Sequence, residues 1–204
     1  KPKPPVGRPD PDHGARPLAP EQRAAADQLL KAVSAGGYSV TLLDGITGSG
    51  KTEVYFEAIA ETLRVGRQTL VLLPEIALTA DFLDRFARRF GERPAEWHSE
   101  VPPRLRERVW RGVADGTIRA IAGARSALFL PFNELGLVVV DEEHDAVYKQ
   151  EEGVTYHARD MAIVRGHLAG FPVVLSSATP SVESRVNADS GRYTRIELKS
   201  RFAE

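Results

Sequence analysis

The sequence predicts an α/β fold with a mostly parallel, doubly wound sheet and helices on both faces. Short apolar runs alternate with stretches of helical periodicity along the chain, as in repeated strand–helix–strand units joined by right-handed crossovers. The run Leu137 to Val140 (LVVV) is apolar throughout, which is typical of a central parallel strand. With 204 residues, of which 42% are hydrophobic, the chain can bury one full core, and we interpret it as one domain.

The composition narrows the classes of protein that need consideration. A formal charge of −1 gives no general attraction to nucleic acid, so any DNA contact must come from local patches. No apolar run approaches the roughly 18 residues of a membrane span and no leader is recognisable, so we expect no membrane partner. Cysteine is absent, which excludes disulfides and thiolate zinc sites, and the histidines show no close ligand pairing, so we expect no zinc in this chain.

The first elements are a linker and a helix. Residues 1–17 hold six prolines and few apolar side chains, which predicts an extended linker. Because the chain begins with Lys1 and not Met, we expect this linker to continue from an upstream region and the folded domain to span residues 18–204. Residues 18–34 predict a helix, since Ala25, Leu29 and Val33 recur every four positions, and Gly36-Gly37 ends it.

A phosphate-binding motif follows the first predicted strand, Val40 to Leu43. The sequence GITGSGKT matches G-x-x-x-x-G-K-[ST], in which glycines let successive backbone N–H groups converge on phosphate oxygens at the start of a helix. Lys51 would reach the β- and γ-phosphates of a nucleoside triphosphate, and the Thr52 hydroxyl would coordinate Mg²⁺. A glycine-rich turn that matches by chance is the alternative. The candidate nucleotide ligands are Gly45, Ile46, Thr47, Gly48, Ser49, Gly50, Lys51 and Thr52.

Periodicity places the remaining elements. Helices are predicted around Tyr55, Ile59 and Leu63, around Phe82, Phe86 and Phe90, around Leu105, Val109 and Val113, and around residues 161, 164 and 168. Strands are predicted at residues 69–73, 96–98, 118–122, 137–140 and 173–175. We interpret the phenylalanine stripe as core packing rather than a platform for stacking bases. Polar segments at residues 74–79, 141–144 and 177–179 follow strands, where the ligand crevice of such a sheet lies.

Two acids complete a candidate hydrolytic site. Asp141 and Glu142 end the LVVV strand, which we expect to lie beside the strand that carries the glycine-rich loop. Asp141 would hold Mg²⁺ through water, and Glu142 would orient or deprotonate the attacking water, so that Lys51, Asp141 and Glu142 form the predicted catalytic set. A solvated acidic turn is the alternative, because four acids lie within five residues.

The order of these motifs resembles that of a known family. The segments GITGSGKT, PEIALT, GARS, DEEH and SSATP resemble the first, RecA-like motor lobe of superfamily-2 helicases, with DEEH at residues 141–144 as the DEAD/DEAH-type box. More narrowly, DEEHDAVYKQEEGVTYHARD, GARSALFLPF and SSATPS are similar to the PriA family of replication-restart helicases, also called primosomal protein N′. The resemblance runs from Leu18 to Phe202.

The resemblance implies roles for individual residues. It implies ATP as the nucleotide, adenine recognition by Gln22, and magnesium binding by Thr52 and Asp141. His144, Ser177 and Thr179 would couple the nucleotide state to movement between lobes. Thr79, Arg125 and Ser126 would lie along the backbone of single-stranded DNA. The segment after the box would sense DNA, with stacking faces and positive charge from Tyr148, Lys149, Tyr156, His157 and Arg159.

Two residues depart from the family pattern. Val154 stands where an aromatic residue is expected, and Ala124 stands where threonine is usual. Both weaken the implied DNA contacts more than the ATP site. Either tyrosine of the post-box segment can also be explained by local packing, and an arginine such as Arg125 by solvation.

At the level of the whole protein, the resemblance implies a 3′-to-5′ DNA helicase of the bacterial cytoplasm. It would remodel stalled forks and promote primosome assembly, with primosome and single-strand-binding proteins as partners. The family's second lobe carries two zinc clusters and an arginine that completes the ATP site, so we expect this lobe alone to be nearly inactive. The alternative is a nucleotide-binding primosome scaffold that does not unwind DNA. A P-loop kinase would not require SSATP or the post-box segment.

Overall fold

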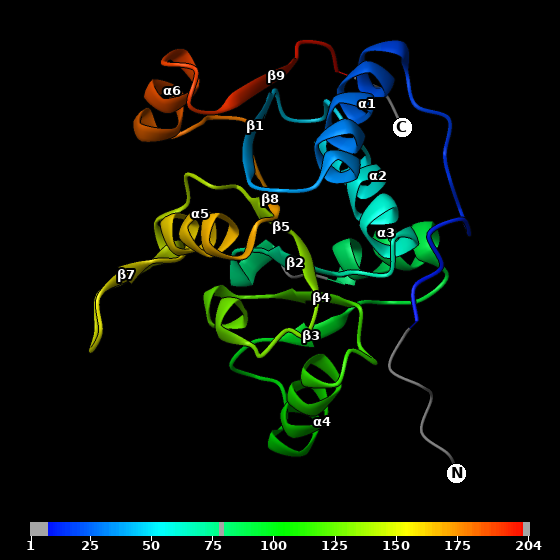
Figure 1. The fold of residues 1–204 in the computed structure, drawn as a ribbon, viewed down its shortest axis with the longest axis vertical. Helices are drawn as coiled ribbons and strands as arrows, with labels where there is room; N and C mark the ends of the chain where they lie inside the picture. Colours follow the sequence, from blue (N-terminus) through cyan, green and yellow to red (C-terminus); the bar gives the residue numbers. More distant parts are fainter. Residues whose placement is uncertain (1–7, 78–79, 202–204) are drawn as a thin grey trace.

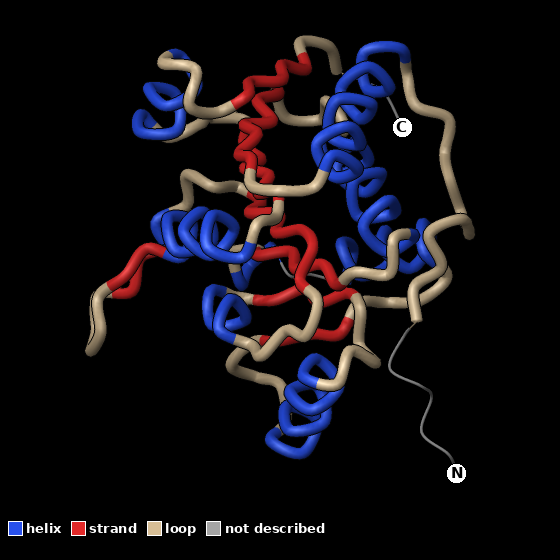
Figure 2. Tube along the Cα trace, in the orientation of Figure 1, coloured by secondary structure: helices blue, strands red, loops and turns tan. Residues whose placement is uncertain are grey.

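The computed structural model describes residues 8–77 and 80–201 and contains a seven-stranded sheet (Figures 1 and 2). All neighbouring strands in this sheet are parallel, and their order is β3-β4-β2-β5-β8-β1-β9. This confirms the predicted fold class. The strands are β1 (Ser39–Gly45), β2 (Gln68–Leu72), β3 (Ala95–Trp97), β4 (Ala120–Gly123), β5 (Leu135–Asp141), β8 (Pro172–Ser177) and β9 (Thr194–Leu198).

Helices cover both faces of the sheet because alternate strand residues point to opposite sides. Leu43 and Val139 contribute to the cluster beneath α1 (Pro20–Ala35), α2 (Lys51–Arg64) and α3 (Ala80–Phe90). Their neighbours Leu42 and Val138 contribute to a second cluster with α4 (Pro103–Ala114) and α5 (Ala158–Ala169). Figure 1 shows α1, α2 and α3 on one side of the strands and α5 on the other. Shorter helices are η1 (Glu75–Ala77), η2 (Arg125–Phe129), η3 (Ala146–Tyr148) and α6 (Val182–Asp189).

The phenylalanine stripe of α3 is core, as predicted. Phe82, Phe86 and Phe90 surround Phe56 of α2, with ring centroids 5.5 to 6.0 Å from it. Phe86 and Phe90 are fully buried, so they offer no face to a base. These contacts fix α3 against α2, the helix that begins at Lys51.

One predicted neighbour relationship is wrong. The strand that carries the glycine-rich loop, β1, does not lie beside β5, because β8 is inserted between them. Ser176 of β8 pairs with Asp141 of β5, and Ser177 pairs with Asp44 of β1. The ends of all three strands nevertheless meet at one edge of the sheet, which brings the SSATP segment between the two halves of the candidate site.

The helix predicted from residues 161, 164 and 168 exists as α5, but these residues do not form its buried face. Leu168 is 80% exposed, and Met161 and Val164 are also exposed. The buried face is made of the small residues Ala158, Ala162 and Gly166. A Cβ at Gly166 would lie 2.6 Å from Val173 Cγ2, so the small residues are what allow this helix to approach β8.

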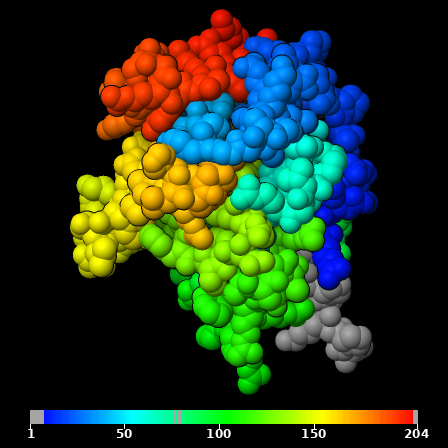
Figure 3. All heavy atoms as spheres, viewed as in Figure 1, coloured from blue at the N-terminus to red at the C-terminus, as the bar shows by residue number. Residues whose placement is uncertain are grey.

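Three further features were not predicted. α6 and β9 are the last helix and strand among the described residues, and β9 pairs with the edge of β1 opposite β8. The short antiparallel strands β6 (Lys149–Gln150) and β7 (Tyr156–His157) form a hairpin that projects from the body of the molecule (Figures 1 and 3). In residues 8–17, which contain no helix or strand, Asp10 N and Gly14 N donate to carbonyl oxygens at the end of α3.

Candidate nucleotide site

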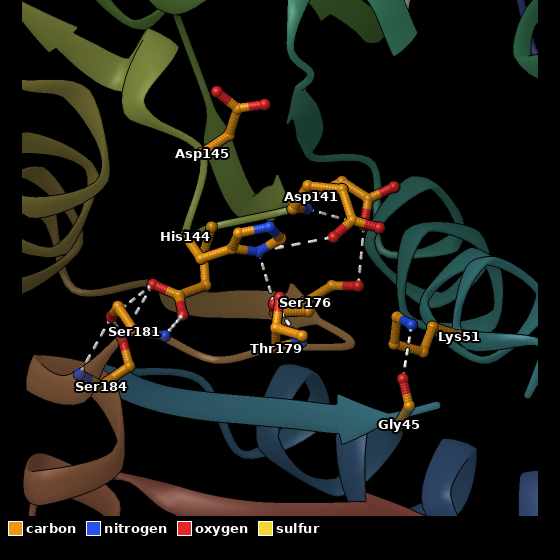
Figure 4. A network of polar contacts seen from close by, with 12 residues as sticks. Gly45, Lys51, Asp141, His144, Asp145, Ser176, Thr179, Ser181 and Ser184 are labelled. Atoms are coloured by element: carbon orange, nitrogen blue, oxygen red, sulfur yellow. Dashed lines mark hydrogen bonds and ion pairs between the residues drawn. The ribbon is translucent and has the colours of Figure 1, made fainter. Parts of the chain in front are cut away.

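The glycine-rich loop has the conformation that its sequence predicts. Gly48 and Gly50 both adopt positive φ, of 80° and 78°, and α2 begins directly afterwards at Lys51. A side chain is accommodated poorly at these positions, and the open N–H groups of a helix start favour phosphate. The Lys51 ammonium donates to the Gly45 carbonyl oxygen at 2.6 Å, so the cation lies over the loop (Figure 4).

Gln22 joins α1 to this loop. Its Nε2 donates to the Ser49 carbonyl oxygen at 3.1 Å, and its Oε1 accepts from Ala19 N at 3.0 Å. The side chain is buried, and it lines the same cavity as Lys51. A primary amide has two N–H groups and two acceptor lone pairs, so adenine recognition would use the groups that these two bonds leave available.

Asp141 is held on both carboxylate oxygens. Oδ1 accepts from Ser176 Oγ at 2.8 Å and from Glu142 N at 3.1 Å. Oδ2 accepts from the Tyr55 hydroxyl at 3.0 Å. Two strands and one helix therefore fix this carboxylate, because β5 supplies it and donors from β8 and α2 orient it.

Glu142 has a strained backbone and a perturbed carboxyl group. Among the described non-glycine residues, Glu142 is the one with a positive φ, which is 47°. Burial, followed by the charge of Asp141, raises the pKa of Glu142, while the nearby Lys51 ammonium opposes the rise. A carboxylate with a raised pKa is a better proton acceptor, which suits the predicted general base.

A cavity of about 380 Å³ brings most of the predicted ATP-site residues together, while Gly45, Ile46 and Ser49 do not line it. Its lining includes Thr47, Gly48, Lys51 and Thr52 from the loop and Asp141 and Glu142 from the box. Across the described ranges 8–77 and 80–201, no cluster of three or more His, Cys, Asp or Glu side chains is placed to hold a metal ion. The pair Thr52 and Asp141 instead fits Mg²⁺ that arrives with nucleotide, because Mg²⁺ commonly takes one or two protein oxygens, phosphate oxygens and water.

The three predicted coupling residues are in contact. His144 Nδ1 lies 2.7 Å from Ser177 Oγ, and the same hydroxyl oxygen accepts from Thr179 N at 3.0 Å (Figure 4). His144 Nδ1 also lies 3.5 Å from a carboxylate oxygen of Glu142. The box and the SSATP segment are thus joined directly beside the candidate base.

The sequence interpretation missed the role of Glu143. Its carboxylate is fully buried, where it accepts from Arg159 Nη1 at 3.1 Å, from Ser184 Oγ at 2.9 Å and from Ser181 N at 2.7 Å. Its position between two predicted site residues, Glu142 and His144, was a signal that it differs from a solvated turn. Its partners lie 16 to 41 residues away, however, so the pattern alone did not reveal them.

Several predicted DNA-sensing residues occupy other places. Tyr148 is fully buried and donates to the carbonyl oxygens of Leu72 and Asp141, so it has no free stacking face. Arg159 is buried in ion pairs with Glu143 and Asp160, so its charge is also not presented to DNA. The expectation that these two side chains contact DNA is corrected: both hold the post-box segment against the sheet.

The other predicted DNA residues remain accessible to different degrees. Lys149 is exposed and pairs with Glu151, and Ser126 is exposed. Tyr156 and His157 are half-buried, and the Tyr156 ring packs edge-on against Phe129. Arg125 donates to the carbonyl oxygens of Val147 and Lys149, which ties the GARS segment to the post-box segment. Thr79 lies outside the described residues.

The departures from the family pattern differ in their surroundings. Ala124 is buried, and its backbone N–H donates to Trp97 O, which keeps the start of the GARS segment against β3. Val154 is 81% exposed in the segment that connects β6 to β7.

The parallel sheet, the glycine-rich loop and the acids that face it define the class: a P-loop lobe of the RecA-like α/β type. Residues 19–187 match the model of the DEAD/DEAH box helicase family, and the chain belongs to that family. Membership implies use of ATP with Mg²⁺.

Comparison with curated proteins refines this assignment. The chain is 48% identical over 187 residues to a replication restart protein PriA of Chlamydia pneumoniae, covering 91% of this chain and 25% of that protein. It is 44% identical over 185 residues to the PriA protein of Bacillus subtilis, covering 91% of this chain and 23% of that protein. The resemblance to PriA proteins is confirmed, and the chain spans about a quarter of the length of these relatives.

Solved structures agree on the fold. A crystal structure described as a hypothetical ATP-dependent RNA helicase from Sulfolobus tokodaii superposes with a TM-score of 0.62 at 18% identity, covering 91% of this chain and 53% of that one. The Hef helicase domain of Pyrococcus furiosus gives a TM-score of 0.61 at 18% identity, covering 87% of this chain and 37% of that one.

No helix among residues 8–77 and 80–201 combines the length and apolarity needed to cross a membrane.

Proposed function

We propose that this chain is the ATP-binding lobe of a 3′-to-5′ DNA helicase that recognises and remodels stalled replication forks and promotes primosome assembly. The observation that carries the proposal is the convergence of Lys51, Asp141 and Glu142 on one cavity at the ends of β1 and β5. The similarity to replication restart proteins supports the restart role. The helicase would act in the bacterial cytoplasm.

In this proposal each group at the cavity has a distinct task. The loop N–H groups and Lys51 bind the phosphates, and Gln22 recognises adenine while it steadies the loop through Ser49. Thr52 and Asp141 hold Mg²⁺, which supplies neutralisation of phosphate charge. Glu142 accepts a proton from water, and the nearby Lys51 ammonium favours the ionised carboxylate that this task needs.

The nucleotide state would reach the rest of the motor through contacts beside Glu142. His144, Ser177 and Thr179 form a continuous hydrogen-bonded chain from the box to the SSATP segment. We assign coupling to this chain. The second lobe, which would lie in cis in the parent protein, would respond to it.

The DNA-facing part of the proposal rests on Arg125, Ser126, Lys149, Tyr156 and His157, together with Thr79. Arg125 connects the proposed strand path to the post-box segment, because it binds carbonyl oxygens on both sides of Tyr148. A structural neighbour described as the helicase MrfA bound to DNA is consistent with a DNA substrate for this fold. Single-strand-binding and primosome proteins are the proposed protein partners.

The first experiment tests the pocket. Titration of this chain with a fluorescent ATP analogue is expected to show saturable binding that Mg²⁺ tightens, and Lys51→Ala is expected to abolish it, because the phosphates lose their cation. Arg111→Ala, on the exposed surface of α4, is the matched control and should bind like the wild type. Absence of binding by the wild type contradicts the proposed function. Binding is the readout because an arginine supplied by another lobe contributes about 10³ to 10⁵ in rate.

The second candidate function, a nucleotide-binding primosome scaffold, is favoured by the two departures at Ala124 and Val154. Fork restart by the full-length parent distinguishes the candidates. A motor requires Lys51, so Lys51→Ala should abolish both unwinding and restart. Restart that survives this substitution unaltered would favour the scaffold.

A further inference from the structure

Tyr55 links the start of α2 to the carboxylate at the end of β5. It lies one helical turn after Lys51 and Thr52, on the same helix, and its side chain is fully buried. The phenol hydroxyl donates to Asp141 Oδ2 at 3.0 Å. The ring packs edge-on against Phe56, whose own neighbours are the phenylalanines of α3. The hydroxyl is therefore held in place by a packed aromatic core.

The bond from Tyr55 completes the set of donors around Asp141. Ser176 Oγ and Glu142 N donate to Oδ1, while the Tyr55 hydroxyl donates to Oδ2 from α2. A carboxylate bound on both oxygens cannot rotate freely about its side-chain bonds. Oδ1 already accepts two bonds, whereas Oδ2 accepts one and keeps a lone pair for a metal ion or a metal-bound water.

Tyr55 joins the two elements that supply the candidate magnesium ligands. Thr52 belongs to α2, as Tyr55 does, and Asp141 ends β5. The phenol has one O–H, and it donates to Asp141. The hydroxyl therefore connects the helix of one candidate ligand to the carboxylate of the other.

We infer that Tyr55 is a positioning residue, which orients the Asp141 carboxylate toward a magnesium–nucleotide complex and locks it to the helix that binds the phosphates. This inference rests on the proposed function. It assigns to Tyr55 a role beyond the apolar stripe with Ile59 and Leu63. A tyrosine that served packing alone would affect the free energy of unfolding without changing how strongly Mg²⁺ tightens nucleotide binding.

The test is Tyr55→Phe, which removes the hydroxyl and keeps the ring. Dissociation constants for a fluorescent ATP analogue are measured on the full chain in EDTA and in saturating Mg²⁺, and their ratio is the magnesium gain. Tyr55→Phe is expected to leave the EDTA value within about twofold of wild type and to reduce the gain about tenfold, since the lost bond is to a charged group. Tyr193→Phe, a half-buried tyrosine outside the cavity lining, is the control and should retain the full gain.

A second variant keeps the inference testable if Tyr55→Phe does not fold. Ser176→Ala removes the side-chain donor on the other carboxylate oxygen, so it should also reduce the magnesium gain. If Tyr55→Phe folds and its magnesium gain is unchanged or larger, the inference is overturned while the proposed function stands. If Tyr55→Phe does not fold, an unchanged or larger gain in Ser176→Ala overturns the inference in the same way. If the wild type binds no nucleotide, both fail. Thermal unfolding of each variant identifies the folded ones.

Discussion

Glu142 concentrates strain and charge in one residue. A left-handed backbone on a non-glycine residue costs about 1–3 kcal/mol and persists where the surroundings enforce it. Here the surroundings are the Asp141 carboxylate, which accepts from Glu142 N, and Asp145 N, which donates to Glu142 O. The strain turns the chain sharply after β5, so that adjacent carboxylates serve the cavity instead of alternating across the sheet.

Glu142→Gln should separate binding from hydrolysis. The amide keeps the size of the side chain but cannot accept the proton, so ATP hydrolysis by the full-length parent is expected to fall by about 10²-fold or more. Nucleotide affinity of this chain should change little, because Lys51 and Asp141 remain. Retention of the wild-type hydrolysis rate would show that another group acts as the base.

The pH dependence of the parent's hydrolysis provides a companion readout. Burial and Asp141 raise the pKa of Glu142, so the base becomes protonated at a higher pH than an ordinary glutamate as the solution is acidified. The acid limb of kcat should therefore lie above the usual glutamate range. It should be absent from the residual activity of Glu142→Gln.

Residue positions that depend on a fixed local spacing were predictable. Gly48, Lys51 and Asp141 follow from a motif, because the phosphate cradle and the strand-end acid are built by neighbouring residues. Tyr148 and Arg159 were misjudged because their burial depends on partners elsewhere in the chain, such as the Leu72 carbonyl and Glu143. Residue type alone does not tell whether an aromatic or basic side chain is exposed to DNA or buried in the fold.

At the scale of elements, Glu143 is the joint between the box, α5 and α6. Its buried carboxylate binds Arg159 at the first turn of α5 and the Ser181 and Ser184 groups at the first turn of α6. Ser181 caps α6 by accepting from Ser184 N. One buried carboxylate therefore connects the box to two helices, to α5 through an ion pair and to α6 through hydrogen bonds.

Arg159→Ala should destabilise the chain by about 3 kcal/mol, because it leaves the Glu143 charge buried without its cation. Urea unfolding of this chain measures the effect. Arg111→Ala removes an arginine from an exposed pair with Glu107 and should cost less than about 1 kcal/mol. Equal effects of the two substitutions would mean that the Glu143 pair is not a structural joint.

The sequence pattern predicted α5 but not its orientation. Hydrophobic periodicity assigns the larger apolar residues to the core, whereas close approach of a helix to a sheet selects the small ones. Ala158, Ala162 and Gly166 have the spacing i, i+4, i+8, and that second stripe was present in the sequence. Choosing between the two stripes requires knowing how closely β8 lies to the helix.

At the scale of the whole molecule, the fold class followed from alternation of strands and helices, but the strand order did not. Two strands can be separated in the sheet by a strand that comes later in the chain, as β8 separates β1 from β5. β9 was also missed, although Ile196 and Leu198 alternate with exposed residues as a strand with one buried face does. Five residues with two apolar side chains make a weak pattern, and its meaning depends on the unpaired edge of β1.

That edge gives the last prediction. β9 covers β1 along residues 41–45, and Leu198 O accepts from Ile46 N in the glycine-rich loop at 3.4 Å. Ile196 is buried in the same cluster as Leu43 and Val54, so Ile196→Ala should reduce the free energy of unfolding by about 2–5 kcal/mol. Thr194→Ala, at an exposed position of the same strand, should change it by less than about 0.5 kcal/mol. Urea unfolding distinguishes an integral strand from a frayed one: if both variants unfold at the wild-type midpoint, β9 does not stabilise the edge that supports the nucleotide loop.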